Sequence, residues 1–361
     1  MKKEFMFIAS LPTKTHYFDG ERNKSKDVLN ALRKEYGDKF STINLSKNQY
    51  LQVLKMIILS FFIKYRFVFV SKCLVGGSRA IKLLLKFSKK INKERIIFYV
   101  IGNGSNGFED KTIYFDCLKK TACIIVESPD VKKEFVDKKI MAGDKMVIVP
   151  CVKPVYSLKP IEKEYPIETL NVIFFSRVVE SKGLMDAILA ITELNESSNK
   201  ILFNLDIAGG IGATKEEQEF LDKVKKISND KEYINYLGLS LRIDGEESYR
   251  RLQHYDLHIF PSKFFQECAP GSIIDMFIAG VPTLSSNFSS AHYLMSEKDS
   301  YFFKMCDIKD LKEKLLFIYN NQMTLNSKRI AANKNYPMYT TTSFINKLNE
   351  VLSSEAFKNG K

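Results

Sequence analysis

The chain has 361 residues, of which 45% are hydrophobic and 27% are charged. This length is sufficient for two domains that each bury a core, and this composition excludes a disordered, collagen-like or coiled-coil chain. The formal net charge is +13, but residues 1–150 hold 29 basic and 15 acidic residues, whereas the remaining 211 residues hold 26 and 27, so we expect the two halves to face different partners.

Short apolar runs alternate with helical patterns along the first half of the chain. Residues Asp27–Tyr36 and Val131–Lys138 have helical periodicity and lie between such runs. Continuous apolar strands that are separated by helices are typical of a parallel sheet covered on both faces. The strands predicted here are Phe5–Ala9, Phe67–Val70, Ile96–Ile101, Cys123–Val126 and Met146–Val149.

A second series of apolar runs begins after residues 153–166, a stretch that contains prolines and lysines. Two consecutive series predict two doubly wound α/β domains joined near residue 160. Ligands of such sheets bind outside the carboxyl ends of the strands, so the strand-to-loop junctions are the places where a site is expected. The strands of this series are predicted at Val172–Ser176, Phe203–Ala208, Ile234–Leu237, Leu257–Phe260 and Pro282–Ser285.

The cysteines and the apolar segments indicate the compartment. The six cysteines show no spacing that is typical of a zinc site or a disulfide framework, which favours a reducing cytosol. The apolar stretch within residues 1–10 is too short for a signal peptide, so it is predicted to be a buried strand. The most apolar segment, Met56–Val70, is interrupted by Lys64 and Arg66, whereas about 20 uninterrupted apolar residues are needed to span a bilayer.

Two segments between Lys39 and Lys93, a stretch with 12 basic residues and no acid, have helical periodicity. The first has an apolar stripe, and the second has a lysine stripe opposite apolar residues. Basic amphipathic helices are typical of elements that lie on a membrane surface, and an anionic leaflet attracts each nearby Lys or Arg by about 1 kcal/mol. The stripes consist of Leu51, Leu54, Ile58, Phe61 and Phe62, and of Lys82, Lys86, Lys89, Lys90 and Lys93.

Two other interpretations of this basic stretch stay open. In one, the apolar sides pack on the sheet and the lysines form a solvated face. In the other, the basic groups neutralise the phosphates of a nucleic acid. No helix-turn-helix, zinc-finger or RNA-recognition signature is found, so nucleic acid is not expected as a partner. We predict that residues 47–93 bind an anionic membrane surface.

The sequence GNGSNG at residues 102–107 has the glycine spacing of a dinucleotide site, and Glu127 lies 20 residues beyond its last glycine. An NAD(P)-dependent oxidoreductase is therefore an alternative. Glu109 and Asp110, however, would occupy the first helical turn, where a pyrophosphate binds, and would repel it. We favour a glycine-rich turn that lines a binding cleft, with Asn103 as a candidate contact residue.

Two cationic residues follow the first strand of the second series. Arg177 comes directly after Val172–Ser176, and Lys182 with Gly183 begins the next helix. An arginine can bind phosphate oxygens in bidentate fashion and a lysine supplies a point charge, so the pair suits a diphosphate. The alternative is a pair of surface charges near a helix cap.

A loop of small residues follows the strand Leu257–Phe260 and carries two acids. Glu267 lies in the loop and Asp275 lies one or two turns into the next helix. Carboxylates accept hydrogen bonds from sugar or ribose hydroxyls, and the backbone N–H groups near Gly271 and Ser272 suit a phosphate or a sugar oxygen. An acidic turn that only stabilises the helix is the alternative for either acid alone.

The order of these motifs resembles glycosyltransferase family 4, whose members are retaining enzymes with the two-domain GT-B fold. The resemblance rests on FFSRVVESKG, YLG and PGSIIDMFIAGVP, and PGSIID is similar to a subset associated with exopolysaccharide or capsule assembly. It implies two Rossmann-like domains facing a central cleft. Residues 1–160 would face the acceptor and the membrane, residues 161–338 would bind the nucleotide sugar, and residues 339–361 would form a helix that packs back toward the first domain.

The resemblance also implies a role for each matched residue. Arg177 and Lys182 would bind the donor diphosphate and stabilise the leaving group, and Glu267 would contact the transferred sugar. Asp275 would hold the ribose hydroxyls, and Gly20 would lie near the phosphates and the acceptor. The backbone alongside the sugar would be that of Cys268, Ala269, Pro270 and Gly271.

The sequence departs from the family pattern in three places, one of which is two extra residues between Ser262 and Glu267. The second acid of the loop is more often Glu, whereas this chain has Asp275. The family commonly has a His at the end of a first-domain strand, where this chain offers Asn103. His16 is a possible substitute, and which of the two acts near the reacting centre stays open.

These features together predict a cytoplasmic glycosyltransferase that is held on the inner face of the cell membrane. It would transfer a sugar from a nucleotide-diphosphate-sugar to a membrane-associated glycan or lipid-linked acceptor in surface polysaccharide synthesis. No D-x-D follows an apolar strand, so neither a metal nor another cofactor is expected. The alternatives are the oxidoreductase and a membrane-binding protein without catalytic activity.

Overall fold

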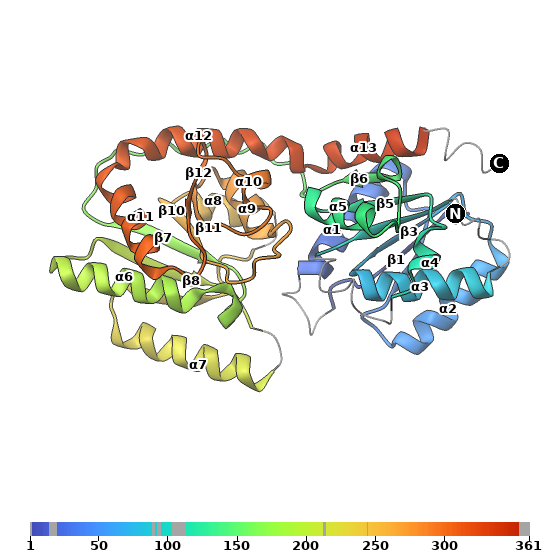
Figure 1. The fold of residues 1–361 in the computed structure, drawn as a ribbon, viewed down its shortest axis with the longest axis horizontal. Coiled ribbons are helices and arrows are strands. Elements are labelled where there is room, and N and C mark those ends of the chain that lie inside the picture. Colours follow the sequence, from blue (N-terminus) through green and yellow to red (C-terminus); the bar gives the residue numbers. More distant parts are fainter. Residues whose placement is uncertain are drawn as a thin grey trace. The chain divides into compact units, whose positions relative to one another are not determined.

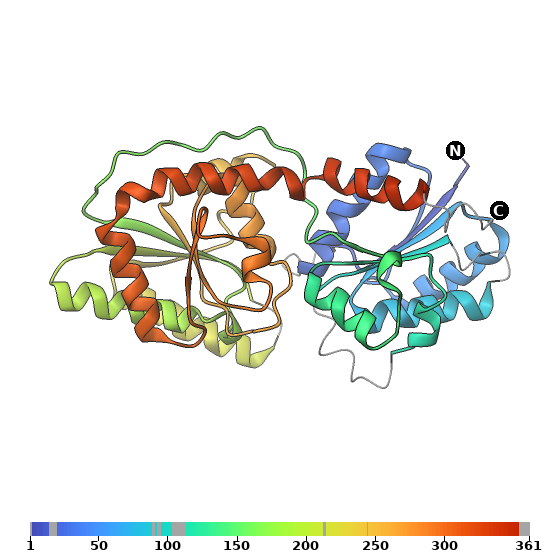
Figure 2. The same cartoon turned by 45° about the horizontal axis from the view of Figure 1, so that its top comes forward.

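The structure, a computed structural model, describes residues 2–13, 20–88, 91, 95–102, 113–211, 214–243 and 245–353. The chain forms two compact units: unit 1 is Met1–Val155 with Met338–Lys361, and unit 2 is Tyr156–Pro337. Each unit has one six-stranded sheet in which every pairing is parallel, with helices on both faces (Figures 1 and 2). The prediction of two doubly wound α/β domains is therefore confirmed.

The sheet of unit 1 has the strand order β2-β1-β3-β4-β5-β6. Five strands agree with the predicted ranges to within two residues, and β2 was not predicted. Phe40 and Ile43 of β2 are buried, but Ser41, Thr42 and Asn44 interrupt the apolar pattern, as is usual for an edge strand. The strands are β1 (Phe5–Ala9), β2 (Phe40–Asn44), β3 (Phe67–Lys72), β4 (Ile96–Val100), β5 (Cys123–Val126) and β6 (Met146–Ile148).

The helices of unit 1 lie on both faces of its sheet. Helices α1 and α13 pack on one face, where Phe7 and Phe69 share a core with Phe344 and Leu348. Helices α2 and α3 run side by side on the other face (Figure 1). The helices are α1 (Gly20–Tyr36), α2 (Gln49–Phe62), α3 (Leu74–Phe87), α4 (Phe115–Leu118), α5 (Pro129–Asp137) and α13 (Thr341–Ser353).

The sheet of unit 2 has the strand order β12-β11-β10-β7-β8-β9. Five strands again agree with the predicted ranges to within two residues, and the edge strand β12 was not predicted. The order makes β7 and β10 direct neighbours, so the loops that follow them lie side by side. The strands are β7 (Leu170–Phe175), β8 (Phe203–Ala208), β9 (Ile234–Gly238), β10 (Leu257–Phe260), β11 (Thr283–Ser286) and β12 (Ser300–Phe303).

The helices of unit 2 bury both faces of its sheet. Helices α6, α7 and α11 pack on one face, and α8 and α9 pack on the other. No described helix in either unit is long and apolar enough to cross a membrane. The helices are α6 (Leu184–Ser198), α7 (Lys215–Asp230), α8 (Glu247–Leu252), α9 (Gly271–Ala279), α10 (Ala291–Leu294), α11 (Ile308–Asn320) and α12 (Leu325–Asn335).

A buried arginine ties α12 to the rest of unit 2. Arg329 is fully buried and donates hydrogen bonds to the carbonyl oxygens of Ile161, Tyr255 and Gln253 at 2.9, 2.7 and 2.5 Å. A buried carbonyl that loses its donor costs free energy comparable to a lost hydrogen bond. Arg329 therefore fixes the chain before β7 and the turn before β10 in one position.

Replacing Arg329 by methionine is expected to lower the free energy of unfolding of unit 2 by about 3 kcal/mol, because three buried carbonyls lose their donor. Thermal and denaturant unfolding measure this loss. The control is Arg251→Met, which breaks only an exposed pair with Glu247 on α8 and is expected to cost under about 0.5 kcal/mol. Equal stability of the two variants would contradict a structural role for Arg329.

Candidate functional site

A tight turn places the start of α6 against the end of β10. Gly183 has φ +70°, and a Cβ at this position would lie 1.8 Å from the carbonyl oxygen of Pro261. A side chain is therefore excluded both by the left-handed backbone and by the neighbouring chain. The turn brings the short 3-10 helix Glu180–Lys182 to the carboxyl end of the sheet.

Lys182 and Glu267 form an ion pair at this edge of the sheet. Their side chains are only 15% and 11% exposed, so the pair is shielded from bulk water. The hydroxyl of Ser262 donates to the Glu267 carboxylate at 3.0 Å, and the ring of Phe260 lies 5.4 Å from the lysine nitrogen. The structure thus brings together two residues that are 85 positions apart and that the sequence singled out for one site.

A second ion pair joins the same two loops. Lys263 pairs with Asp186 of α6 at 2.8 Å, and its backbone N–H donates to the carbonyl of Ser181. These contacts fix the loop that carries Glu267 against the loop that carries Lys182. The sequence analysis missed both Lys263 and Ser262, although their polar side chains directly after a buried strand were a signal.

Arg177 also lies at this edge but is not part of the cluster. It follows Ser176 at the end of β7, and its side chain is exposed. Among the residues that the structure describes, none forms an ion pair or hydrogen bond with its guanidinium. A solvent-exposed guanidinium at this place can still bind an anion, but the structure does not bring Arg177 into contact with Lys182 or Glu267.

The loop from Cys268 to Gly271 leads into α9. Cys268 and Ala269 are buried, Pro270 precedes the helix, and Gly271 is its first residue. No side chain caps this helix N-terminus in the described part of the chain. Its first backbone N–H groups are therefore available as donors for an acceptor atom.

Asp275 lies in α9 and is almost completely buried. The hydroxyl of Tyr249 donates to its carboxylate at 3.2 Å. Its charge also raises the pKa of Arg242, whereas burial, the larger effect, lowers it. The guanidinium of Arg242 stacks 4.1 Å over the ring of Phe175, the last residue of β7. The sequence analysis missed Arg242. Its neighbours Phe175, Tyr249 and Asp275 belong to β7, α8 and α9, and no local motif marks a residue of this kind.

The candidates of unit 1 are less well defined. Gly20 is the exposed first residue of α1, and a Cβ there would meet nothing within 4 Å. Residues 103–112, which include Asn103, lie outside the described residues, and so does His16. Both candidates therefore stay predictions from the sequence.

Glu127, the acid of the alternative dinucleotide site, is fully buried at the end of β5. It forms an ion pair with Lys24 and accepts a hydrogen bond of 2.7 Å from the backbone N–H of Gly102. Burial raises the pKa of its carboxyl, and the charge of Lys24 acts in the opposite direction. This buried carboxylate already binds Lys24 and the backbone N–H of Gly102. It is therefore poorly suited to bind a ribose.

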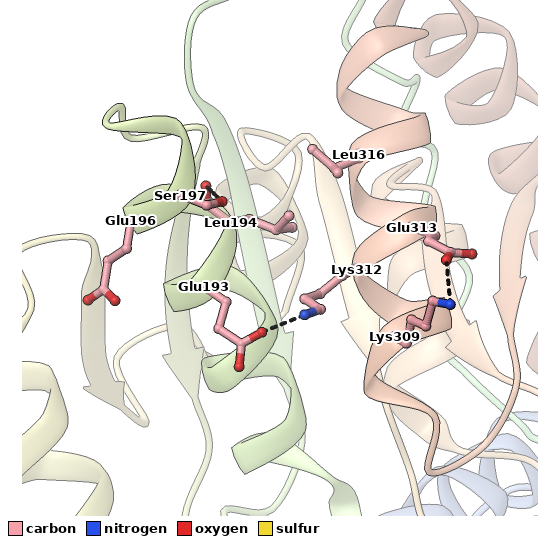
Figure 3. Close-up of a pocket in the computed structure, with 8 residues that line it drawn as sticks. All are labelled: Glu193, Leu194, Glu196, Ser197, Lys309, Lys312, Glu313 and Leu316. Atoms are coloured by element: carbon pink, nitrogen blue, oxygen red, sulfur yellow. Dashed lines mark hydrogen bonds and ion pairs between the residues drawn. The ribbon is translucent and has the colours of Figure 1, made fainter.

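An open groove of about 660 Å³ lies between α6 and α11 (Figure 3). Four of its charged side chains pair with one another, Lys312 with Glu193 at 2.5 Å and Lys309 with Glu313 at 4.0 Å, and Glu196 pairs with Lys231. Its α6 residues belong to the last turns of the helix, and the groove shares no residue with the Lys182–Glu267 pair.

Metal binding has no candidate group in the described ranges, where no three His, Cys, Asp or Glu side chains lie close enough to share an ion. All six cysteines are free.

Comparison with known protein families finds a match in the half of the chain that contains the Lys182–Glu267 pair. The family model described as "Glycosyl transferases group 1" matches residues 160–336, which include the Lys182–Glu267 pair, Arg177 and Asp275. No curated protein matches the chain.

Three solved structures illustrate the similarity of the fold. HepE from Anabaena, in complex with UDP and glucose, is 11% identical, with 98% of this chain and 100% of that chain covered and a TM-score of 0.72. Sucrose-phosphate synthase from Thermosynechococcus elongatus is 11% identical over 97% and 98%, with a TM-score of 0.73. A glycosyltransferase from Rickettsia africae is 13% identical over 98% and 100%, with a TM-score of 0.68. The predicted GT-B fold is therefore confirmed.

Proposed function

We propose that the protein is a metal-independent, retaining glycosyltransferase of family 4 that takes a sugar from a nucleotide-diphosphate donor. The acceptor would be a membrane-associated glycan or lipid-linked sugar in surface polysaccharide synthesis, and unit 1 would rest on the inner face of the cell membrane. The observation that carries the proposal is the shielded Lys182–Glu267 pair at the carboxyl edge of unit 2. It lies within the residues that match the glycosyltransferase model, and the solved relative HepE was crystallised with UDP and glucose.

The donor diphosphate would be held by Arg177 and Lys182. The exposed guanidinium of Arg177 supplies a bidentate anion donor, and the ammonium group of Lys182 supplies a charge that is shielded from bulk water. A shielded charge interacts more strongly with an anion than it would in water, because the effective dielectric constant is lower. The two cations would therefore provide the neutralisation that other enzymes obtain from a metal.

The sugar and the nucleoside would be placed by the two acids. Glu267 is fixed by Lys182 and Ser262, so its remaining acceptor positions have a defined direction toward sugar hydroxyls. The backbone from Cys268 to Gly271, at the start of α9, would contact the sugar alongside it. Asp275 would accept from the ribose, with Tyr249 holding its carboxylate in place.

The reaction needs no nucleophile from the protein. As the bond between the anomeric carbon and the phosphate oxygen breaks, the acceptor hydroxyl forms its bond to that carbon on the same face. Its proton passes to the departing phosphate oxygen, so the configuration is retained. Lys182 and Arg177 would stabilise the charge that develops on the diphosphate, a type of contribution that is usually among the largest in catalysis.

A panel of UDP-, GDP- and dTDP-sugars, with NAD as the comparison, tests the donor class. At a hundred times its dissociation constant, a ligand of the native state stabilises it by about 2.7 kcal/mol, which for a unit of this size raises Tm by roughly 5–10 °C. We expect such a shift with at least one sugar nucleotide and none with NAD. A shift with NAD alone would favour the oxidoreductase, and no shift with any donor would favour the non-catalytic protein.

A further inference from the structure

Helix α2 presents an apolar face to solvent. We define this α2 face as five side chains that are each between 46% and 70% exposed, whereas only Met56 and Ser60 of the helix are buried. The interpretation in which the apolar side packs on the sheet is therefore wrong for α2, whose opposite side packs there. It holds for α3, where Ile81 and Leu84 are buried. The α2 face consists of Leu51, Leu54, Ile58, Phe61 and Phe62.

Such a face is unusual on a water-soluble surface. A helix on a sheet normally turns its apolar stripe inward, and a contiguous apolar patch that stays exposed marks a surface that binds a partner. The neighbouring helix α3 ends beside α2, where the hydroxyl of Ser88 donates to the carbonyl of Ser60 at 2.7 Å, and its last residue, Phe87, is 43% exposed. The apolar stripe of α2 is thus an interaction surface of unit 1.

The charges around the α2 face indicate the chemistry of its partner. Lys47, Lys55 and Lys64 are exposed, and within the described residues none of them forms an ion pair. No acidic residue occurs from Lys39 to Lys93. A second copy of this chain would bring the same cations against one another, whereas an anionic surface would meet both the apolar and the basic groups.

We propose that α2 lies in the plane of an anionic membrane, with the α2 face among the acyl chains and the three lysines at the headgroups. A helix of 14 residues is about 21 Å long, too short to span a bilayer but long enough to lie along it. This assignment deepens the proposed function, because insertion of α2 would hold the enzyme where a membrane-borne acceptor lies. It rests on the proposed function for that acceptor. It requires insertion of apolar side chains rather than adsorption by charge alone.

The absence of tryptophan from the chain allows a direct measurement of insertion. In Phe62→Trp, whose parent side chain is 70% exposed, the single indole is expected to shift its emission to shorter wavelength with phosphatidylcholine–phosphatidylglycerol vesicles. Brominated acyl chains are expected to quench it. The control is Phe317→Trp on α11 of unit 2, where the parent side chain is 53% exposed and no change is expected.

Three results would overturn the assignment. One is an unchanged Phe62→Trp spectrum with vesicles. Another is an emission shift that appears without lipid as the protein concentration rises, because the partner would then be a second copy of this chain. The third is complete release of the protein by 1 M NaCl, since salt screens the attraction of charges but leaves apolar insertion intact.

A pair of matched double variants gives the second measurement. Leu54→Gln/Ile58→Gln removes two side chains that are 54% and 46% exposed, and Phe317→Gln/Ile330→Gln removes two of 53% and 49% in unit 2. We expect the α2 variant to bind the same vesicles at least about tenfold more weakly and the control within about twofold of the parent. Equal binding by both variants would refute the assignment.

The proposed function is tested separately by hydrolysis of the donor in solution, which requires no membrane. We expect both double variants to keep the parent rate of this hydrolysis. Vesicle binding without any donor turnover would support the membrane assignment and overturn the proposed sugar transfer, and donor turnover without vesicle binding would support the use of a sugar nucleotide and overturn the membrane assignment.

Discussion

The variant Lys182→Ala is expected to lose about 10²- to 10³-fold in the rate of sugar transfer while unit 2 stays folded. The substitution removes the shielded cation that would stabilise the leaving diphosphate, and removal of one such preorganised group typically costs this much. It also leaves Glu267, only 11% exposed, without its cationic partner. Initial rates with the donor found in the thermal-shift panel measure the loss.

Lys312→Ala is the matched control for this variant. Lys312 also forms an ion pair with a glutamate of unit 2, Glu193, but it does so in the groove between α6 and α11. Its activity is expected to stay within about twofold of the parent. Near-normal transfer by Lys182→Ala, with an unchanged Tm, would refute the assigned site.

The variant Gly183→Ala is expected to lower the free energy of unfolding of unit 2 by more than 4 kcal/mol. The backbone is left-handed at this residue, and the added Cβ would meet the carbonyl oxygen of Pro261 at 1.8 Å. A backbone atom cannot move away as the end of a flexible side chain can, so β10 and α6 would have to separate. Denaturant unfolding measures the change.

Gly37→Ala separates the two causes of this destabilisation. Gly37 has nearly the same φ, +72°, but a Cβ there would meet nothing within 4 Å. The Gly37→Ala substitution should therefore lower the free energy of unfolding of unit 1 only by the backbone strain, about 1–2 kcal/mol. If the two alanine variants were equally stable, the close approach at Pro261 would be unimportant.

The sequence predicted the buried strands better than the edge strands. The ranges of β1, β5, β8 and β10 agree at both ends, because each is a short apolar run whose boundaries coincide with polar or turn residues. The missed strands, β2 and β12, are at the edges of their sheets. Polar residues interrupt the apolar pattern of β2, and β12 has only four residues, the first of which is Ser300. A prediction based on continuous apolar runs misses strands of this kind.

The candidate site was predictable only in part. Lys182 and Glu267 each stood out in the sequence, but their contact depends on β7 and β10 being neighbours, an order that local patterns do not determine. Likewise, helical periodicity identified the apolar stripe of α2 without showing that the opposite side of the helix packs on the sheet. The pairing of Lys24 with Glu127, 103 residues apart, required the complete fold.

The position of α13 determines the order in which the two units can be completed during synthesis. Phe344 and Leu348 belong to the same core as Phe7 and Phe69, and the rings of Phe69 and Phe344 are 6.2 Å apart. A nascent chain therefore contains every residue of unit 2 before it contains the last residues that unit 1 requires. All residues of unit 2 are thus present first, and the sheet face that α1 and α13 share is only partly covered until the ribosome has passed residue 348.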